Sequence, residues 1–181
     1  MKKTLLMLGL MLLPTVALAA PNFSGTWQRN NASSDPDPYP LYWITRPGPA
    51  MGGGRNAINL MTVHQVGNTL QVADPQHPVR NYTLDGQPHT RPTDNMLSKA
   101  VVTANMQGDN VVIDTTQPYG QMPGNITLKE KEVWALSPDG KTLTVTITRD
   151  IPAKQATLKE VYERTADKGD ALCSAGCVTV K

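Results

Sequence analysis

Two carboxylates stand where a strand pattern would bury them. In the stretch NITLKEKEVWAL, residues 125–136, alternation places Glu130, Glu132 and Trp134 on the same face as isoleucine and leucine side chains. Paired carboxylates in such a site can act as a general acid and base, or as polar contacts to a ligand. A bulge or a position at an open rim would instead turn them outward. We favour this simpler interpretation, because buried carboxylates without partners are rare.

A histidine occurs in a similar pattern. In AINLMTVHQV, residues 57–66, alternation places His64 on the face of Ile58 and Leu60. An imidazole there can serve as a general base, a metal ligand or a hydrogen-bonded lining residue, although a lone histidine is most often simply satisfied within the fold. His77 and His89 lie in proline-rich stretches that predict solvated turns, and their spacing matches no metal motif. We therefore expect no metal and no cofactor.

The sequence carries no recognisable catalytic motif. It has no serine nucleophile elbow, no HExxH and no dinucleotide-binding glycine fingerprint. The GGGR of residues 52–55 lacks the lysine and the hydroxyl of a phosphate-binding loop. We therefore expect a protein that is not an enzyme.

The first 19 residues have the three parts of a cleavable secretory signal. Lys2 and Lys3 form a positive start, residues 5–13 an apolar core, and Ala17-Leu18-Ala19 a cleavage site. The apolar run is too short to span a membrane, so we expect no membrane span in the mature chain. The two lysines account for the whole net charge of +2, and a neutral mature chain argues against nucleic-acid binding. The expected location is the periplasm, with the extracellular space as the alternative.

The remainder predicts one all-β domain over residues 20–165, followed by a tail over 166–181. In TLTVTITR, Leu143, Val145 and Ile147 alternate with threonines, which is the pattern of a strand with one buried and one wet face. About eight strands follow one another through short turns, after a long Pro/Gly-rich loop at 30–56. We expect an antiparallel meander closed into a barrel, because closure removes exposed edges. A two-sheet β-sandwich is the alternative.

The start of this domain resembles a known superfamily. Gly25-Thr26-Trp27 is similar to the G-x-W signature of lipocalins and their calycin relatives, and the combination of FSGTW, VWALSPDGKTLTV and VYER resembles a group of exported bacterial lipocalin-like proteins. The resemblance implies that Trp27 closes one end of the barrel and that Arg164 packs over its ring. Gly25, Trp27 and Arg164 are structural residues under this interpretation.

The resemblance also implies a binding role. We expect a small, partly apolar ligand in the barrel interior. Its lining is expected to comprise Ile58, Leu60, His64, Val102, Trp134 and Val145, with Tyr82 and Glu132 as polar contacts.

Two features support other interpretations. Cys173 and Cys177 in the tail suggest a local disulfide in an exported protein, and a redox or metal pair is the alternative. The loop from Tyr39 to Trp43 suits contacts with a partner. A non-catalytic envelope module with a filled barrel, binding a protein partner there, is therefore the second hypothesis, and an enzyme using His64 and the carboxylates is the third.

Overall fold

The computed structural model describes residues 20–36, 60–74, 77–92, 99–118, 127–151 and 154–165, and within these ranges the regular structure is all β. The strands are β1 (Gly25–Arg29), β2 (Leu60–Val66), β3 (Thr69–Asp74), β4 (His77–Thr83), β5 (Pro88–Pro92), β6 (Lys99–Gln107), β7 (Asn110–Pro118), β8 (Thr127–Leu136), β9 (Thr142–Ile151) and β10 (Lys154–Thr165).

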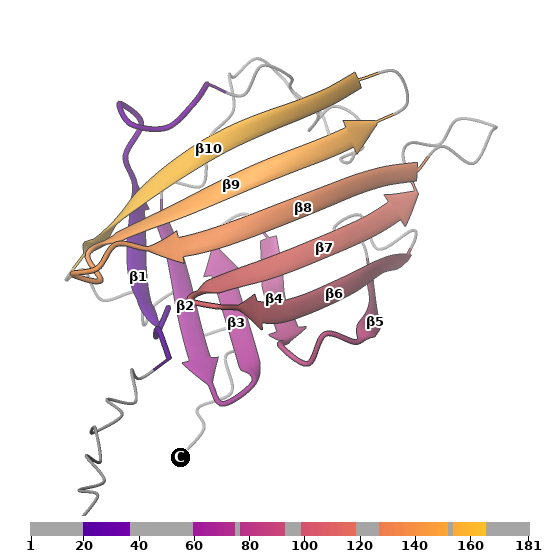
Figure 1. Ribbon diagram of the computed structural model, residues 1–181, viewed down its shortest axis with the longest axis horizontal. Helices are drawn as coiled ribbons and strands as arrows, with labels where there is room; N and C mark the ends of the chain where they lie inside the picture. Colours follow the sequence, from indigo (N-terminus) through magenta and orange to yellow (C-terminus); the bar gives the residue numbers. More distant parts are fainter. Residues whose placement is uncertain are drawn as a thin grey trace, which may run out of the picture.

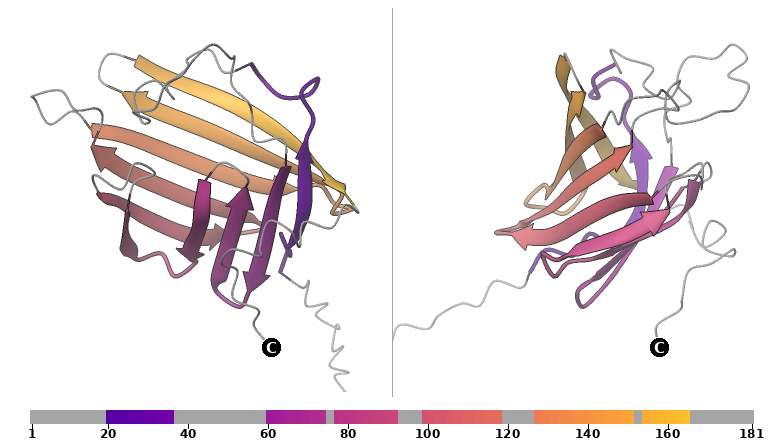
Figure 2. Two further views of the ribbon diagram at one scale, coloured as in Figure 1. Left: turned by 180° about the vertical axis from the view of Figure 1, so that it is seen from behind. Right: turned by 90° about the vertical axis from the view of Figure 1, so that its right-hand side faces the viewer.

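The described strands form one continuous antiparallel sheet. Its order is β4-β3-β2-β1-β10-β9-β8-β7-β6-β5, so the first strand pairs with the last and β4 and β5 are left at the two ends. The sheet curls until β1–β4 cross behind β6–β10 (Figures 1 and 2). The result is a nearly closed barrel with ten strands in the described ranges, not about eight, and its continuous hydrogen bonding excludes the two-sheet sandwich.

Two lines along the barrel wall differ in how their strands pair. The pairing of β1 with β10 is the closed seam, where Trp27 is opposite Arg164 and Arg29 is opposite Tyr162. The line between β4 and β5 is the open seam, because these two strands are the ends of the sheet and do not pair in the described ranges.

The hairpin between β8 and β9 shows how the local sequence sets the meander. The Gly140 N–H donates to the Ser137 carbonyl at 2.8 Å, and Gly140 has a φ of 67°. Glycine adopts this conformation at no steric cost. The Ser137 hydroxyl donates to the Asp139 carboxylate at 2.6 Å, and the SPDG sequence predicted this turn.

Sequence patterns do not predict β5, because its residues PHTRP are typical of a turn. Pro88 and Pro92 lie at its two ends. A proline has no N–H to donate, so prolines in sheets are confined to edge strands and strand ends. The turn before β5 hydrogen-bonds elsewhere: the Leu84 N–H donates to the Asn68 carbonyl and the Gly86 N–H to the Ala104 carbonyl. These bonds and the prolines account for the open seam.

The core fills the inward face of the sheet. Its largest fully buried side chains include Trp27, Phe23, Leu70, Ile113 and Leu143. As predicted from the alternation in β9, Leu143, Val145 and Ile147 are all buried. The described ranges contain no helix long and apolar enough to cross a membrane.

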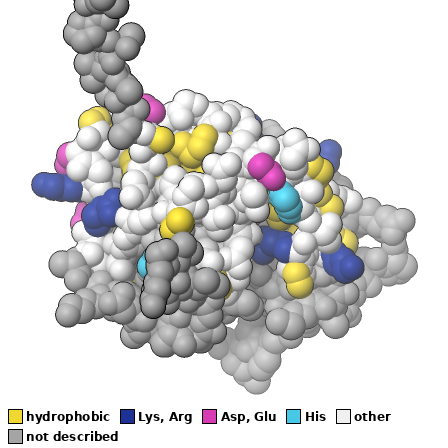
Figure 3. Space-filling view, turned by 90° about the horizontal axis from the view of Figure 1, so that it is seen from below, with side chains coloured by type: hydrophobic (Ala, Val, Ile, Leu, Met, Phe, Trp, Pro, Cys, Tyr) yellow, Lys and Arg dark blue, Asp and Glu magenta, His cyan; other side chains and the backbone are white. Residues whose placement is uncertain are grey.

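On the face seen from below, charges of both signs are scattered among polar and small hydrophobic areas (Figure 3). Several sequence-based predictions lie outside the described residues. They are the signal segment 1–19, the part of the Pro/Gly-rich loop from residue 37 onward with Tyr39 and Trp43, Ile58, and the tail with Cys173 and Cys177.

Candidate functional site

Strand pairing defines which side chains face the interior. Starting from buried Trp27, the register carries the same face to Val63 on β2 and to Val72 on β3. Across β5 to β10, one row of inward-facing positions runs side by side through the wall. The row contains Ala156, Arg149, Glu130, Thr115, Val102 and His89. Half of these side chains are charged or titratable, which is unusual for the inside of a filled barrel.

Near the closed seam the interior is anchored by Trp27. The guanidinium carbon of Arg164 lies 4.3 Å from the centroid of the Trp27 ring. Arg164 also donates to the carbonyl of Ser24 and to that of Gly140, at 2.5 and 2.8 Å. The Trp27 indole N–H donates to the Phe23 carbonyl at 3.0 Å. The packing of Arg164 over the Trp27 ring is the contact that the resemblance implied.

Gly25 makes this arrangement sterically feasible. A Cβ at position 25 would come within 2.5 Å of Nη1 of Arg164, and the φ of Gly25 is +146°. Both the close approach and the backbone conformation therefore require glycine. The Gly25–Trp27 cluster is explained by packing at the closed seam and needs no chemical role.

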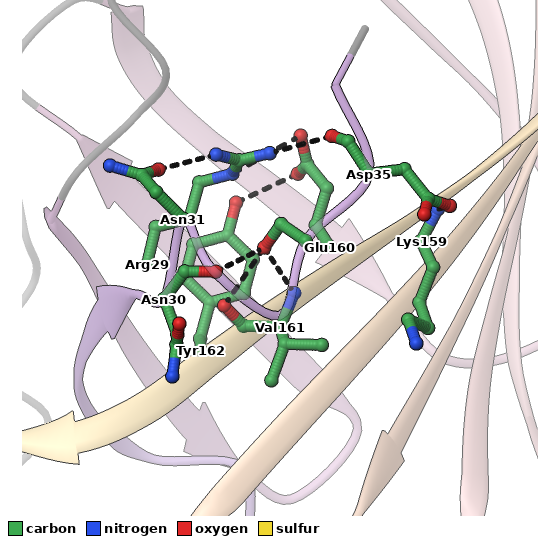
Figure 4. Close-up of polar contacts among 9 residues, drawn as sticks. Arg29, Asn30, Asn31, Asp35, Lys159, Glu160, Val161 and Tyr162 are labelled. Atoms are coloured by element: carbon green, nitrogen blue, oxygen red, sulfur yellow. Dashed lines mark hydrogen bonds and ion pairs between the residues drawn. The ribbon is translucent and has the colours of Figure 1, made fainter.

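A second arginine crosses the closed seam on the inward face. Nε of Arg29 lies 3.8 Å from the Glu160 carboxylate, and both side chains are only 7% exposed. The Tyr162 hydroxyl donates to the same carboxylate at 2.8 Å. Arg29 also donates to the Asn31 side chain and to the Asp35 carbonyl (Figure 4). These contacts fasten residues 31–35 to the barrel wall.

The same loop makes backbone contacts with β10. The Lys159 N–H donates to the Asp35 carboxylate, and the Asp35 N–H donates back to the Lys159 carbonyl, each at 2.8 Å. The Val161 N–H donates to the Ser34 hydroxyl at 2.9 Å. The closed seam is thus continued past the end of β1 (Figure 4).

The two carboxylates of β8 both face inward. Pairing with β7 and β9 runs without interruption from Lys129 to Trp134, so no bulge turns Glu130 or Glu132 outward. Glu130 accepts a hydrogen bond from Nε of Arg149 at 2.5 Å. The bulge interpretation, which the sequence favoured, is wrong for this strand.

Glu132 has a different partner. The Trp134 indole N–H donates to its carboxylate at 2.8 Å. Burial raises the pKa of Glu132, and the negative charge of Glu130 raises it further, whereas Arg80 opposes both effects. A carboxyl whose neutral form is favoured in this way can donate as well as accept hydrogen bonds.

A cavity of about 90 Å³ lies at the open seam. It is lined by residues 81–83 of β4, residues 89–91 of β5, and Val102 and Ala104 of β6. The guanidinium carbon of Arg91 lies 5.8 Å from the centroid of the Tyr82 ring. Burial raises the pKa of Tyr82, which keeps its phenol protonated. His89 is held by Asp85, with 3.0 Å between the imidazole and the carboxylate.

Five of the sequence-predicted lining residues share the inward face: Tyr82, Val102, Glu132, Trp134 and Val145. Leu60 and His64 do not share it. Leu60 pairs with exposed Gln28, and His64 follows inward-facing Val63 in the chain, so both lie on the outer face of β2. The prediction that His64 faces the interior is wrong, and Ile58 lies outside the described residues.

Sequence reasoning missed four charged residues that the inward face contains: Arg29, Arg80, Arg91 and Glu160. Arg80 alternates with Tyr82 in VRNYTL, so a parity argument could have found it. Glu160 alternates with Leu158 and Tyr162 in TLKEVYER, and this signal was available. Arg29 follows Trp27 at strand spacing, so it too was accessible to a parity argument. Arg91 carried no signal, because its strand was not predicted.

Comparisons with known proteins identify the fold. No family model matches the chain, and no curated protein matches it. Among the solved structures, it is similar to the zebrafish ileal bile acid-binding protein crystallised with cholic acid, at a TM-score of 0.50 and 15% identity. The match covers 79% of this chain and 98% of that chain. Together with the nearly closed antiparallel sheet, this likeness shows that the chain shares the β-barrel fold of that protein.

Proposed function

We propose that this protein binds a small, partly apolar molecule inside the barrel, without catalysis. The observation that carries the proposal is the mixed character of the inward face. Arg149, Glu130 and Glu132 stand there beside Ile113 and Ile147. Buried charges cost free energy and add little stability compared with apolar side chains of similar size. A ligand site with a few placed polar groups explains their presence better than a filled core does.

The described residues supply a specific set of contacts for such a ligand. Val102 and Val145 offer apolar surface, while Tyr82 and Glu132 offer hydrogen-bonding groups whose pKa values are raised by burial. The bile acid-binding protein named above shares the fold, and it was crystallised in complex with cholic acid. The class of ligand proposed here is consistent with that likeness and rests on the side chains.

The N-terminal pattern adds a location to the proposal. The positive start, apolar core and A-x-A site of residues 1–19 support export through a cleavable signal, with function in the periplasm. The FSGTW, VWALSPDGKTLTV and VYER motifs are the basis for grouping the chain with exported bacterial lipocalin-like proteins.

Native mass spectrometry of the protein purified from its own host tests the binding role. We expect an added mass corresponding to about one small molecule per chain, which organic solvent extracts. The uncharged dye Nile red then provides a titration of the emptied protein. A bare mass together with no saturable dye fluorescence would mean that the barrel is filled, and would contradict the proposal.

A pair of valine substitutions locates the site. Val145 faces inward and is buried, whereas Val101 faces outward and is 44% exposed. Val145→Phe should weaken dye binding about tenfold or more, because it occupies interior volume. Val101→Phe is the matched control and should leave the affinity unchanged. Equal effects of the two substitutions would place the dye outside the barrel.

A further inference from the structure

The cavity at the open seam passes through the barrel wall. Its lining combines inward-facing Tyr82 and Arg91 with outward-facing, exposed Asn81, Thr83 and Thr90. A solute from outside can therefore reach it without entering the interior. The strands on either side are edge strands, which also present unpaired backbone groups.

Arg91 gives this cavity its charge. Of the lining side chains, it is the one with a fixed charge. Its Nε is buried and has no hydrogen-bond partner in the part of the chain that the structure describes. The nearest identified contact of its guanidinium is the Tyr82 ring. A buried donor without an acceptor costs free energy, which an incoming anion would recover.

The acidic side chains near the cavity already have partners. The charges of Glu132 and Glu130 reach Tyr82, but Glu130 is hydrogen-bonded to Arg149 and Glu132 accepts from the Trp134 indole. Asp85 accepts hydrogen bonds from the Gln87 backbone N–H at 2.9 Å and is 3.0 Å from the His89 imidazole. These two contacts, the backbone one first, lower the pKa of Asp85. The carboxylate of Asp85 is thus occupied by its contacts with the Gln87 backbone and with His89. By contrast, Arg29 and Arg149 each have a glutamate partner on the inward face.

We propose that the open seam binds a small oxyanion, a carboxylate, sulfate or phosphate group, with Arg91 as its charged anchor and Tyr82 as a neighbouring hydroxyl donor. A guanidinium matches the planar or tetrahedral oxygens of such groups through paired N–H donors. The volume of about 90 Å³ admits a group of this size but not a large ligand. This site adjoins the proposed interior site and shares Tyr82 and Val102 with it. Its charged anchor, Arg91, is not among the interior contacts proposed above, so Arg91→Gln tests the oxyanion site on its own.

Titration with sodium sulfate at constant ionic strength, followed by amide NMR shifts, tests the site. We expect saturable shifts at residues 81–83 and 89–91. Arg91→Gln should weaken the binding about tenfold or more, because it removes a charge-assisted contact. Lys131→Gln removes one exposed positive charge on the outer face of β8 and serves as the matched control. It should leave the affinity within about twofold, as expected for an exposed charge.

A second variant avoids any change to buried side chains. Thr90 is exposed and lines the cavity. Thr90→Asp places a negative charge beside the proposed anion, so it should weaken sulfate binding at least as much as Arg91→Gln does. Titration with decyl sulfate distinguishes the source of the anionic group. Saturation by sulfate alone identifies a free ion, whereas saturation only by decyl sulfate, still weakened by Arg91→Gln, identifies the head group of an amphiphile.

The proposal is overturned by either of two results. One is a linear drift of the shifts with both anions, as non-specific screening would give. The other is saturable binding that Arg91→Gln and Thr90→Asp leave unchanged.

Discussion

The two seams of the barrel use arginine in opposite ways. At the closed seam, Arg164 lies over Trp27 and donates to two carbonyls, while Arg29 pairs with Glu160 and holds residues 31–35. At the open seam, Arg91 lies beside a cavity and has no ion pair among the described residues, although the Nε atoms of Arg91 and Arg29 both lack a hydrogen bond there. Arginines that are paired with a carboxylate or with several carbonyls fix a structure, whereas an arginine without an ion pair can still bind an anion. The same side chain thus serves stability on one side of the barrel and recognition on the other.

The largest effect is expected from a substitution at the centre of the closed seam. Trp27→Ala should lower the free energy of unfolding by about 3–5 kcal/mol, because it removes a fully buried ring. It also removes the cation–π contact with Arg164 and the bond to Phe23. Urea denaturation measures the change. Val101→Ala, on an exposed position near the open seam, is the control and should stay within about 0.5 kcal/mol of wild type. A similar loss in both variants would show that Trp27 has no special role.

The second prediction compares the arginines directly. Arg29→Gln removes the buried ion pair between Arg29 and Glu160, and it should lower the free energy of unfolding by about 3 kcal/mol. Arg91→Gln removes no ion pair among the described residues, so its unfolding free energy should stay within about 1 kcal/mol of wild type. Urea denaturation of the two variants gives both unfolding free energies for comparison with wild type. Equal destabilisation would contradict the contrast between the seams.

The smallest expected effect concerns Glu132 on the wall between the seams. Burial raises its folded-state pKa above the unfolded value of about 4.3. The folded state therefore holds the proton to higher pH than the unfolded chain does. The contribution of Glu132 to the free energy of unfolding is therefore fully present below about pH 4.3, and it is lost as the pH rises through the folded-state pKa.

Glu132→Gln does not ionise and keeps an oxygen for the Trp134 N–H. We expect this variant to gain stability relative to wild type between pH 4 and pH 8. The measurement is urea denaturation at both pH values, with exposed Glu163→Gln as the control. A constant difference between Glu132→Gln and wild type over this range would show that Glu132 ionises normally in the folded protein.

Sequence patterns predicted the parts of this fold that obey a clear period. The alternation in β9 identified the inward face, and the turn residues of SPDG located the β8–β9 hairpin. In β2 the pattern was ambiguous, because Leu60, Met61 and Val63 are apolar at both parities. Strand pairing with β1 resolves the face in favour of Met61 and Val63. Single-strand parity cannot supply this information, since it depends on a neighbour distant in sequence.

The candidate site was less accessible from sequence. Charged residues are expected to face water, so a bulge or a position at the open rim was the favoured explanation for Glu130 and Glu132, and the strand pairing excludes the bulge. Their inward orientation becomes reasonable only with partners from other strands, namely Arg149 on β9 and Trp134 two residues along β8. The open seam depends on β5, whose two prolines and lack of large apolar residues hide a strand. Polar interiors and edge strands are thus the features that one sequence reveals least.

The pairing of the first strand with the last has a consequence for how the chain folds. The hydrogen bond between Arg164 and the Ser24 carbonyl joins residues 140 positions apart, whereas the hairpins β6–β7 and β8–β9 involve near neighbours. Closing so long a loop carries a large entropic cost, and proteins rich in such distant contacts fold slowly. During synthesis, β1 has no β10 to pair with until almost the whole described chain has been made. Quenching of Trp27 fluorescence by its late-arriving neighbours should therefore report the final kinetic phase of folding.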